Sequence, residues 1–185
     1  LHFTIHSFPT RRSSDLLNLY GHDGHWLMVD LGITFGGDAF PDYDVLMADP
    51  AFIVSRRQRL AGIVLTHAHE DHVGAVAYLW KRLKCPVYAT PFTAAIARYK
   101  LARAGLEGVP VHELPLGARF EVGPFGVEYI GMTHSIPEPN ALLITTPAGA
   151  VFHTGDWKLD DGPVIGERYD VTRLRLLRRE PVLAM

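Results

Sequence analysis

Seven consecutive residues, Thr66-His67-Ala68-His69-Glu70-Asp71-His72, place three imidazoles and two carboxylates directly after an apolar run. Upstream, Gly62-Ile63-Val64-Leu65 is typical of a short buried strand, and downstream Val73, Val76 and Trp80 recur at helical spacing. The pattern predicts that this polar stretch lies in the turn from a strand to a helix. In such a turn, side chains can converge on one point because the residues are not also part of a helix or strand.

The spacing within this stretch favours a metal site. His67 and His69 are two residues apart, so both imidazoles point to the same side of an extended segment and can hold one ion. Asp71 and His72 follow at the expected helix start, where aspartate is also a favoured N-cap, and they can reach a second position nearby. Nitrogen and carboxylate ligands without thiolate favour zinc, with manganese or iron as competitors. The alternative, a polar loop of surface histidines, explains poorly why five ligand-type residues fall within six positions.

Two later strands are expected to end in a ligand-type residue as well. Residues 127–133 lead to His134, and residues 150–155 lead to Asp156. Strand ends are a usual place for site residues on a sheet scaffold. Alone, His134 would be an ordinary turn histidine. Together with the first cluster, it is the expected third nitrogen donor for the ion held by the first two histidines.

The segment before this cluster predicts a hairpin with a supporting carboxylate. Leu17 to Tyr20 and Trp26 to Asp30 have the composition of short strands, separated by the turn Gly21-His22-Asp23-Gly24. Asp30 ends the second apolar strand, and we expect it to support the metal loop from behind the ligands. His22 and His25 flank the turn, and His112 alternates within a later strand, so these three are expected to be solvated rather than ligating.

Composition is that of an ordinary globular domain. The 185 residues are 48% hydrophobic and 21% charged, which suits one domain with a real core. No apolar run approaches the length of about 18 residues that a membrane span needs, and no secretory signal is recognisable. The single cysteine, Cys85, excludes an internal disulfide, fits a reducing cytosol, and is expected to be a small buried residue. A net charge of −2 gives no global signature of nucleic-acid binding.

The first sixteen residues do not match the rest of the chain. Residues 7–16 resemble the conceptual translation of a common sequencing adapter, and they show no periodicity. We therefore interpret residues 1–16 as a non-native artefact and residues 17–185 as the domain. Within it, the patterns predict a polar loop at 36–50, a helix carrying Trp80, strands at 86–89, 109–114, 119–122 and 125–132, a helix at about 91–104, a late helix, and the start of a strand at 182–185.

The motifs resemble those of a known family. Residues 66–72 match the H-x-H-x-D-H motif of the metallo-β-lactamase superfamily. The segments that lead to His134 and Asp156 match its third and fourth motifs. More narrowly, residues 65–75, 133–137 and 153–160 resemble the bacterial ribonuclease J family. The resemblance runs from about Leu17 to the end of the chain.

This resemblance implies a fold and a ligand set. The fold is the α/β (αββα) sandwich of four layers, of which the chain would hold the N-terminal part. The cofactors would be two zinc ions, with manganese as the alternative. One ion would be held by His67, His69 and His134 and the other by Asp71 and His72, with Asp156 as the bridge; Asp71 and Asp156 would be catalytic, and His153 would orient a ligand or the loop or take a direct part.

The resemblance also implies an activity. A hydroxide activated by two metals would hydrolyse RNA phosphodiesters, by 5′-to-3′ exonuclease and endonuclease cleavage in the full-length parent. The partner would be single-stranded RNA with a 5′-monophosphate, in the cytoplasm and without a membrane, and a homo-oligomer of the parent is left open. Family members continue with a β-CASP insert, a further histidine ligand and a C-terminal domain, so the chain is expected to be a fragment with little activity alone.

Two other functions stay open. One is another hydrolase of the superfamily, acting on a thioester, lactone or sulfate ester, although the Trp157-Lys158-Leu159-Asp160 segment after Asp156 argues against it. The other is a catalytically inert module that binds metal or contacts RNA. The late helix carries four arginines that could meet phosphates or could simply form a solvated face, namely Arg173, Arg175, Arg178 and Arg179.

Overall fold

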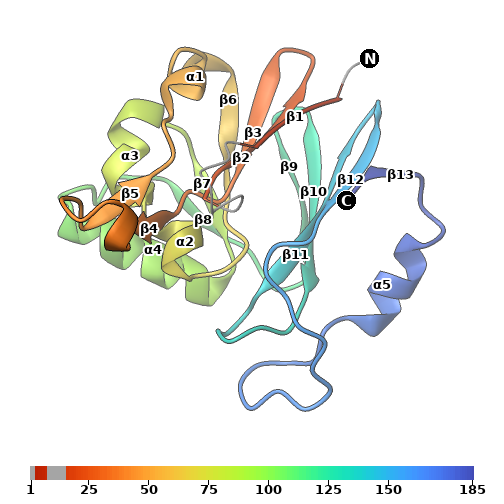
Figure 1. Ribbon diagram of the computed structural model, residues 1–185. Coiled ribbons are helices and arrows are strands. Elements are labelled where there is room, and N and C mark those ends of the chain that lie inside the picture. Colours follow the sequence, from red (N-terminus) through yellow and green to blue (C-terminus); the bar gives the residue numbers. More distant parts are fainter. Residues whose placement is uncertain (1–2, 8–15) are drawn as a thin grey trace.

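The computed structural model describes residues 3–7 and 16–185, and its two main β-sheets pack face to face with helices on their outer sides (Figure 1). The first sheet has the strand order β1 (Phe3–Ser7), β2 (Asn18–His22), β3 (His25–Val29), β6 (Leu60–Val64), β7 (Val87–Ala89) and β8 (Val111–Glu113). The second has the order β13 (Val182–Ala184), β12 (Gly149–His153), β11 (Asn140–Thr146), β10 (Phe125–Gly131) and β9 (Arg119–Val122).

A tight hairpin starts the first sheet and parallel crossovers complete it. β2 and β3 pair antiparallel through a turn in which Asp23 and Gly24 have φ of 48° and 73°, the conformation that a two-residue hairpin turn requires. β3, β6, β7 and β8 are parallel neighbours. Parallel strands need long connections, and here these contain α1 (Ala51–Val54), η2 (Arg57–Arg59), α2 (Glu70–Val73), α3 (Val76–Leu83) and α4 (Pro91–Arg103).

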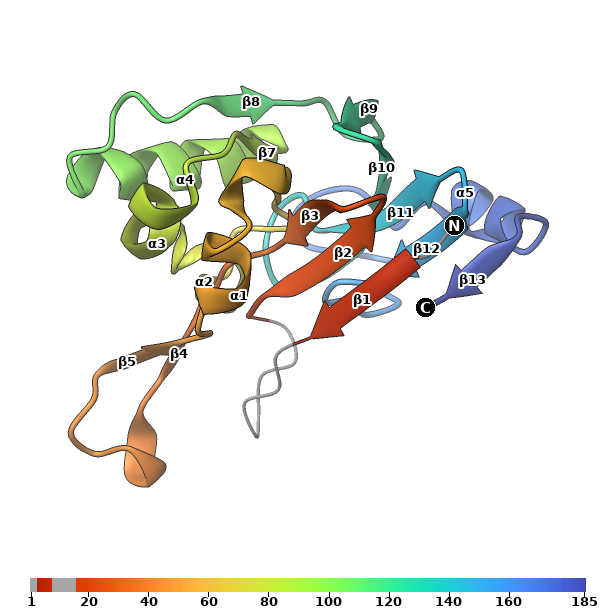
Figure 2. The ribbon, with the colours of Figure 1, turned by 90° about the horizontal axis from the view of Figure 1, so that it is seen from above.

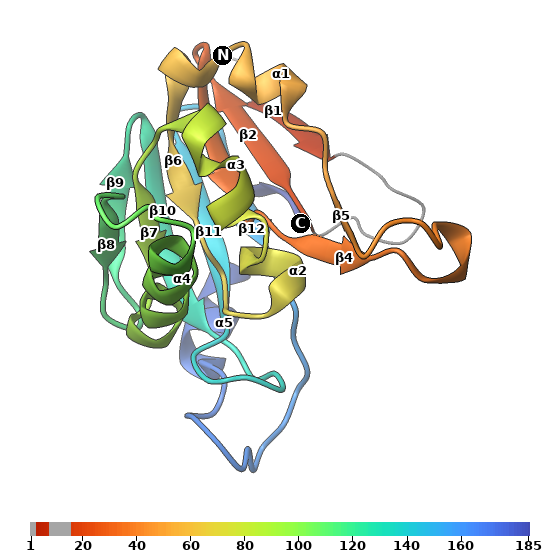
Figure 3. The same cartoon turned by 90° about the vertical axis from the view of Figure 1, so that its left-hand side faces the viewer.

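Three apolar layers hold the sheets and helices together. α3 and α4 lie over the outer face of the first sheet (Figure 3), and side chains such as Ile63 and Leu79 fill the space between them. Between the two sheets, Val64 of β6 packs in one cluster with Tyr129 of β10. The outer face of the second sheet contacts α5 (Val171–Leu177) through Leu143 and its neighbours. The order is therefore helix, sheet, sheet, helix, as predicted.

A small hairpin projects from this body. β4 (Ile33–Phe35) pairs antiparallel with β5 (Val45–Met47), and the 3₁₀ turn η1 (Gly37–Ala39) lies between them. Figure 2 shows the hairpin extending away from the two sheets. The polar loop predicted at 36–50 therefore contains two regular elements that were not predicted, η1 and β5.

Most other predicted elements are confirmed, with two differences. The helix expected after residue 72 is divided into α2 and α3, because the chain between them bends back and Ala75 N donates to Leu31 O at 2.9 Å. β11 was not anticipated, although it is a central strand of the second sheet. Among the described residues, no helix is long and apolar enough to cross a membrane.

A foreign N-terminal segment is expected to lie apart from the domain. The described N-terminal residues instead contact it. β1 pairs antiparallel with β2 along its whole length. Leu16 is buried in the core beneath the helices, and its carbonyl accepts a hydrogen bond from Gly32 N at 2.8 Å. That expectation is wrong for these described residues; residues 1–2 and 8–15 lie outside the described part of the chain.

Candidate metal centre

The candidate site forms where strands of both sheets end. Residues 66–72 follow β6, His134 comes shortly after β10, and Asp156 comes shortly after β12. Sequence-distant residues therefore meet at one edge of the sandwich, as the strand-end pattern predicted.

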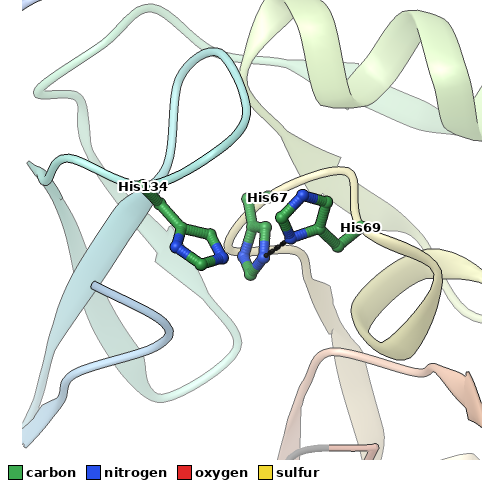
Figure 4. A group of neighbouring side chains, drawn as sticks. All are labelled: His67, His69 and His134. Atoms are coloured by element: carbon green, nitrogen blue, oxygen red, sulfur yellow. Dashed lines mark hydrogen bonds between the residues drawn. The ribbon is translucent and has the colours of Figure 1, made fainter. Parts of the chain in front are cut away.

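Three imidazoles converge in the first group. The ligand atoms of His67, His69 and His134 all lie within 4.8 Å of one another. Figure 4 shows the His134 ring approaching from one side and the His67 and His69 rings from the other. His67 Nε2 is 3.1 Å from His69 Nδ1. Three nitrogen donors facing one point suit a tetrahedral zinc ion with one position left over.

A second group shares His67 with the first. His67, His72 and Asp156 also bring one ligand atom each within 4.8 Å of the others. Asp156 lies between the groups, with Oδ1 3.5 Å from His72 Nε2 and Oδ2 3.6 Å from His134 Nε2. The carboxylate of Asp71 is 3.8 Å from His72 Nε2 and half exposed. The structure thus places the six residues predicted as ligands near one another, with Asp71 outside both groups, and Asp156 faces His72 with one carboxylate oxygen and His134 with the other.

The donor set also shows a sign of an absent partner. His72 Nε2 is buried and makes no hydrogen bond of good geometry within the described residues. A buried imidazole nitrogen normally has a partner, because leaving it unpaired costs free energy. An ion held by His72, Asp71 and Asp156 would satisfy this atom, so the residues fit a metal.

Asp30 lies fully buried beneath these ligands. Its Oδ1 accepts a hydrogen bond from Thr66 N at 2.7 Å, and its Oδ2 accepts one from the Thr66 hydroxyl at 2.8 Å. His72 Nδ1 lies 2.8 Å from the same Oδ2. Because an ionised carboxylate only accepts, Nδ1 of His72 carries the proton and Nε2 faces the candidate site. This is the supporting position that the sequence predicted for Asp30.

Thr66 in turn determines which ring nitrogen of His67 carries the proton. Its hydroxyl proton is used on Asp30, so its oxygen accepts from His67 Nδ1, 2.9 Å away. The Nε2 lone pair of His67 is then free to bind an ion. Sequence reasoning placed Thr66 beside the ligands but did not foresee this function. The only signal was its position directly before His67.

The electrostatics favour the metal-binding form of His67 and Asp156 but oppose it at His72. Burial, followed by the charge on His72, lowers the pKa of His67 to about 3, so His67 is neutral. The interaction with His72, whose Nε2 lies 3.5 Å away, lowers the pKa of Asp156 to about 2, so Asp156 is ionised. Burial opposes the charged form of His72, but Asp30 and then Asp156 outweigh it and raise its pKa to about 10. A proton held by His72 would have to leave as an ion binds.

The loop that carries the ligands approaches another backbone closely. A Cβ on Gly32 would lie only 1.6 Å from Asp71 O. Leu31 N donates to His72 O at 2.7 Å in the same contact. Only glycine permits this approach, so Gly32 fixes the start of α2 against the segment after β3.

The remaining predicted residues have less direct positions. His153 is outside both candidate metal groups of the described residues, and its Nδ1 lies 2.7 Å from the Tyr20 hydroxyl. Cys85 is buried and His112 is exposed, as predicted. His22 was expected to be solvated, which is wrong: it is buried because the inward face of β2 continues to the strand end.

Of the four arginines expected on the late helix, Arg173 and Arg175 lie in α5, and Arg178 and Arg179 follow its end. Arg173 is largely buried, and its Nε and Nη2 donate to the Glu128 carboxylate at 2.6 and 2.8 Å. Arg175, Arg178 and Arg179 are exposed. Neither of the two expected roles, contact with phosphates or a solvated face, fits Arg173, whose guanidinium binds carboxylates inside the domain.

A match to a known protein family identifies the superfamily of this chain. A model described as the beta-lactamase superfamily domain matches residues 35–179. The chain belongs to the β-lactamase superfamily. A solved member of similar fold, the metallo-β-lactamase fold protein YhfI from Bacillus subtilis, gives a TM-score of 0.59 at 19% identity and covers 83% of this chain and 60% of that one. This likeness supports the fold alone.

Curated members of the superfamily are more similar in sequence. The chain is 47% identical over 169 residues to a Ribonuclease J of Sinorhizobium meliloti, covering 90% of this chain and 30% of that protein. It is 36% identical over 171 residues to Ribonuclease J 1 of Streptococcus pyogenes, covering 91% and 30%. A Ribonuclease J of Helicobacter pylori is 37% identical over 150 residues, covering 80% and 22%. The chain spans less than a third of the length of these relatives.

Proposed function

We propose that the chain belongs to a metal-dependent ribonuclease of the ribonuclease J type that hydrolyses RNA phosphodiesters. The observation that carries the proposal is the 47% identity to a protein named Ribonuclease J over nine tenths of the chain. The candidate metal centre supplies a chemical basis for it. The finer activity proposed is 5′-to-3′ exonuclease with endonuclease cleavage of 5′-monophosphorylated single-stranded RNA.

The proposed ligand set follows the two side-chain groups. His67, His69 and His134 would hold one zinc ion, Asp71 and His72 the other, and Asp156 would bridge them. Two bound ions supply an acidified water molecule and positive charge for the oxygens of a phosphate under attack. Manganese is the alternative metal.

The chain's own residues prepare this chemistry. Asp30 and Thr66 fix the Nε2 atoms of His72 and His67 towards the site. Asp156 presents an ionised carboxylate between the two groups, and Asp71 is exposed enough to meet a substrate or solvent. A cavity of about 400 Å³ is lined by His134 but by none of the other five proposed ligands.

The test uses a chimera because the chain covers less than a third of its relatives. Residues 17–185 replace the matching segment of the S. meliloti protein, and the chimera is assayed with 5′-monophosphorylated single-stranded RNA and with a glutathione thioester. We expect metal-dependent RNA cleavage and no thioester hydrolysis. Two variants, His67→Ala and His69→Ala, serve as inactive controls, and the parent S. meliloti protein serves as the positive control.

Two outcomes would reject this proposal. Thioester turnover without RNA cleavage would favour another hydrolase of the superfamily. A folded chimera that binds zinc and cleaves neither substrate would favour an inert metal-binding module. We expect the chain alone to cleave RNA only weakly, because its described residues offer few donors for a second ion.

A further inference from the structure

His134 is the only member of its metal group that comes from the second sheet, and it lies on a connection held in place by hydrogen bonds. This connection, residues 132–139, joins β10 to β11. At its base, Met132 N donates to Pro139 O at 2.9 Å. Next to His134, Thr133 O accepts from Lys158 N at 2.8 Å. These contacts fix the two ends of the connection. The bend at Glu138 is held by a different contact.

Glu138 supplies that anchor at the N-terminus of α4. Its Oε2 accepts a hydrogen bond from Phe92 N at 2.9 Å. The first N–H groups of a helix have no partner within the helix, and Thr90, the N-cap residue of α4, makes no side-chain cap bond. Glu138 therefore takes the place of a local cap from 46 residues away. A carboxylate at this end is also favoured by the helix dipole.

The backbone of Glu138 also helps to hold the 132–139 connection in place. Its φ is 55°, a left-handed conformation that a residue with a side chain rarely adopts. Its carbonyl accepts from Asn140 Nδ2 at 2.7 Å. Asn140 is buried and also donates from its backbone N to Thr66 O at 3.2 Å. Thr66 directly precedes His67, so the bend is tied to both α4 and the segment that carries the first two ligands.

We propose that Glu138 is a positioning residue for the metal centre: its hydrogen bond to α4 holds the 132–139 connection so that His134 meets His67 and His69. The inference rests on the metal centre of the proposed function. Because Glu138 touches none of the ligands, its effect runs through the position of His134. Loss of the anchor lets His134 retreat, which weakens the group of three imidazoles and leaves His72 and Asp156 in place.

The test measures metal affinity instead of catalysis. Zinc affinity is determined by chelator competition for the purified chain and for Glu138→Ala, Glu138→Gln and Glu167→Ala. Glu167 is an exposed carboxylate that lines the same cavity as His134, so it controls for the loss of negative charge nearby. Cobalt absorption reports the coordination of the tight site, and thermal unfolding of the metal-free protein reports the fold.

We expect Glu138→Ala to weaken zinc at the tight site by about tenfold to a hundredfold and to lower the cobalt absorption. Glu138→Gln keeps an acceptor oxygen and should restore both, and Glu167→Ala should match the unaltered chain. If Glu138→Ala does not fold, Glu138→Asp, shorter by one methylene, replaces it and should still weaken the site.

Three results would overturn the inference. One is unchanged affinity and absorption in folded Glu138→Ala, and another is a Glu138→Gln variant as weak as Glu138→Ala. An unaltered chain that binds no zinc would overturn the metal centre together with the inference. A chain that binds zinc as described, in a chimera that cleaves no RNA, would reject only the proposed function.

Discussion

The two halves of the metal centre are held by different means. His67 and His72, from the first sheet, are almost completely buried and rest on Asp30 and Thr66. His134 and Asp156, from the second sheet, are partly exposed and stand on connections fixed mainly by backbone contacts. The first half is therefore preorganised by the core itself, whereas the second half depends on a few hydrogen bonds. We therefore expect substitutions in the first half to change mainly stability and substitutions in the second half to change mainly metal affinity.

The largest effect is expected at Asp30. Asp30→Ala leaves the Thr66 N–H, the Thr66 hydroxyl and His72 Nδ1 without their buried acceptor. Removing one partner of such a buried group costs about 3 to 5 kcal/mol. For a chain of this size that lowers the melting temperature by roughly 6 °C or more. Thermal unfolding of the metal-free protein measures it.

Asp156→Ala is the matched change in the other half. Asp156 is partly exposed, so its loss should cost less than about 1 kcal/mol in the metal-free protein. Equal destabilisation by the two substitutions would contradict the difference between the halves.

The second effect concerns metal binding. We expect one tight ion, since His67, His69, His134 and Asp156 can complete four ligands, and one weak ion, since only Asp71, His72 and the shared Asp156 are at hand among the described residues. In zinc titrations, His134→Ala should abolish the tight site and His72→Ala should barely change it. Two equally tight ions per chain would reveal ligands that the two groups do not include.

The sequence indicated the candidate ligands more readily than the residues that support them. Residue type and spacing singled out His67, His69 and His72 as candidates, because a strand followed by a helix fixes where such side chains point. Glu138 and Thr66 act through contacts with residues 46 and 36 positions away, and no local pattern reports such pairs. β11 was missed because its buried apolar stretch, residues 141–144, has no alternation to mark it.

A third, smaller effect is expected on the outer face of the second sheet. The Glu128 carboxylate accepts hydrogen bonds from Arg173 and Arg119. Burial opposes ionisation of Glu128, but these bonds outweigh it, so its pKa lies below the ordinary value of 4.5. Glu128→Gln should therefore cost about 1 to 3 kcal/mol at pH 7.

The pH dependence of this cost has a fixed sign. Because the pKa of Glu128 is lower in the folded state, the stabilisation is present above pH 4.5 and is lost as the pH falls through the folded value. Urea unfolding at neutral and acidic pH should show the two proteins converging in acid. Glu113→Gln, at an exposed pair with Arg98, is the control and should change stability by less than about 1 kcal/mol. A cost for Glu128→Gln that grows towards acid would contradict this assignment.

The smallest effect is expected at the edge of the first sheet, and it tests our proposal that residues 1–16 are foreign to the domain. Among the described strands β1 pairs with β2 alone, so deleting residues 1–15 removes one edge pairing and keeps the buried Leu16. We expect the melting temperature to change by less than a few degrees. Deleting residues 1–16 also takes the Leu16 side chain from the core, which should cost about 2 to 5 kcal/mol more. If the shorter deletion alone lowers the melting temperature by several degrees, equivalent to about 1 to 2 kcal/mol, β1 contributes to the fold and the segment is part of the domain.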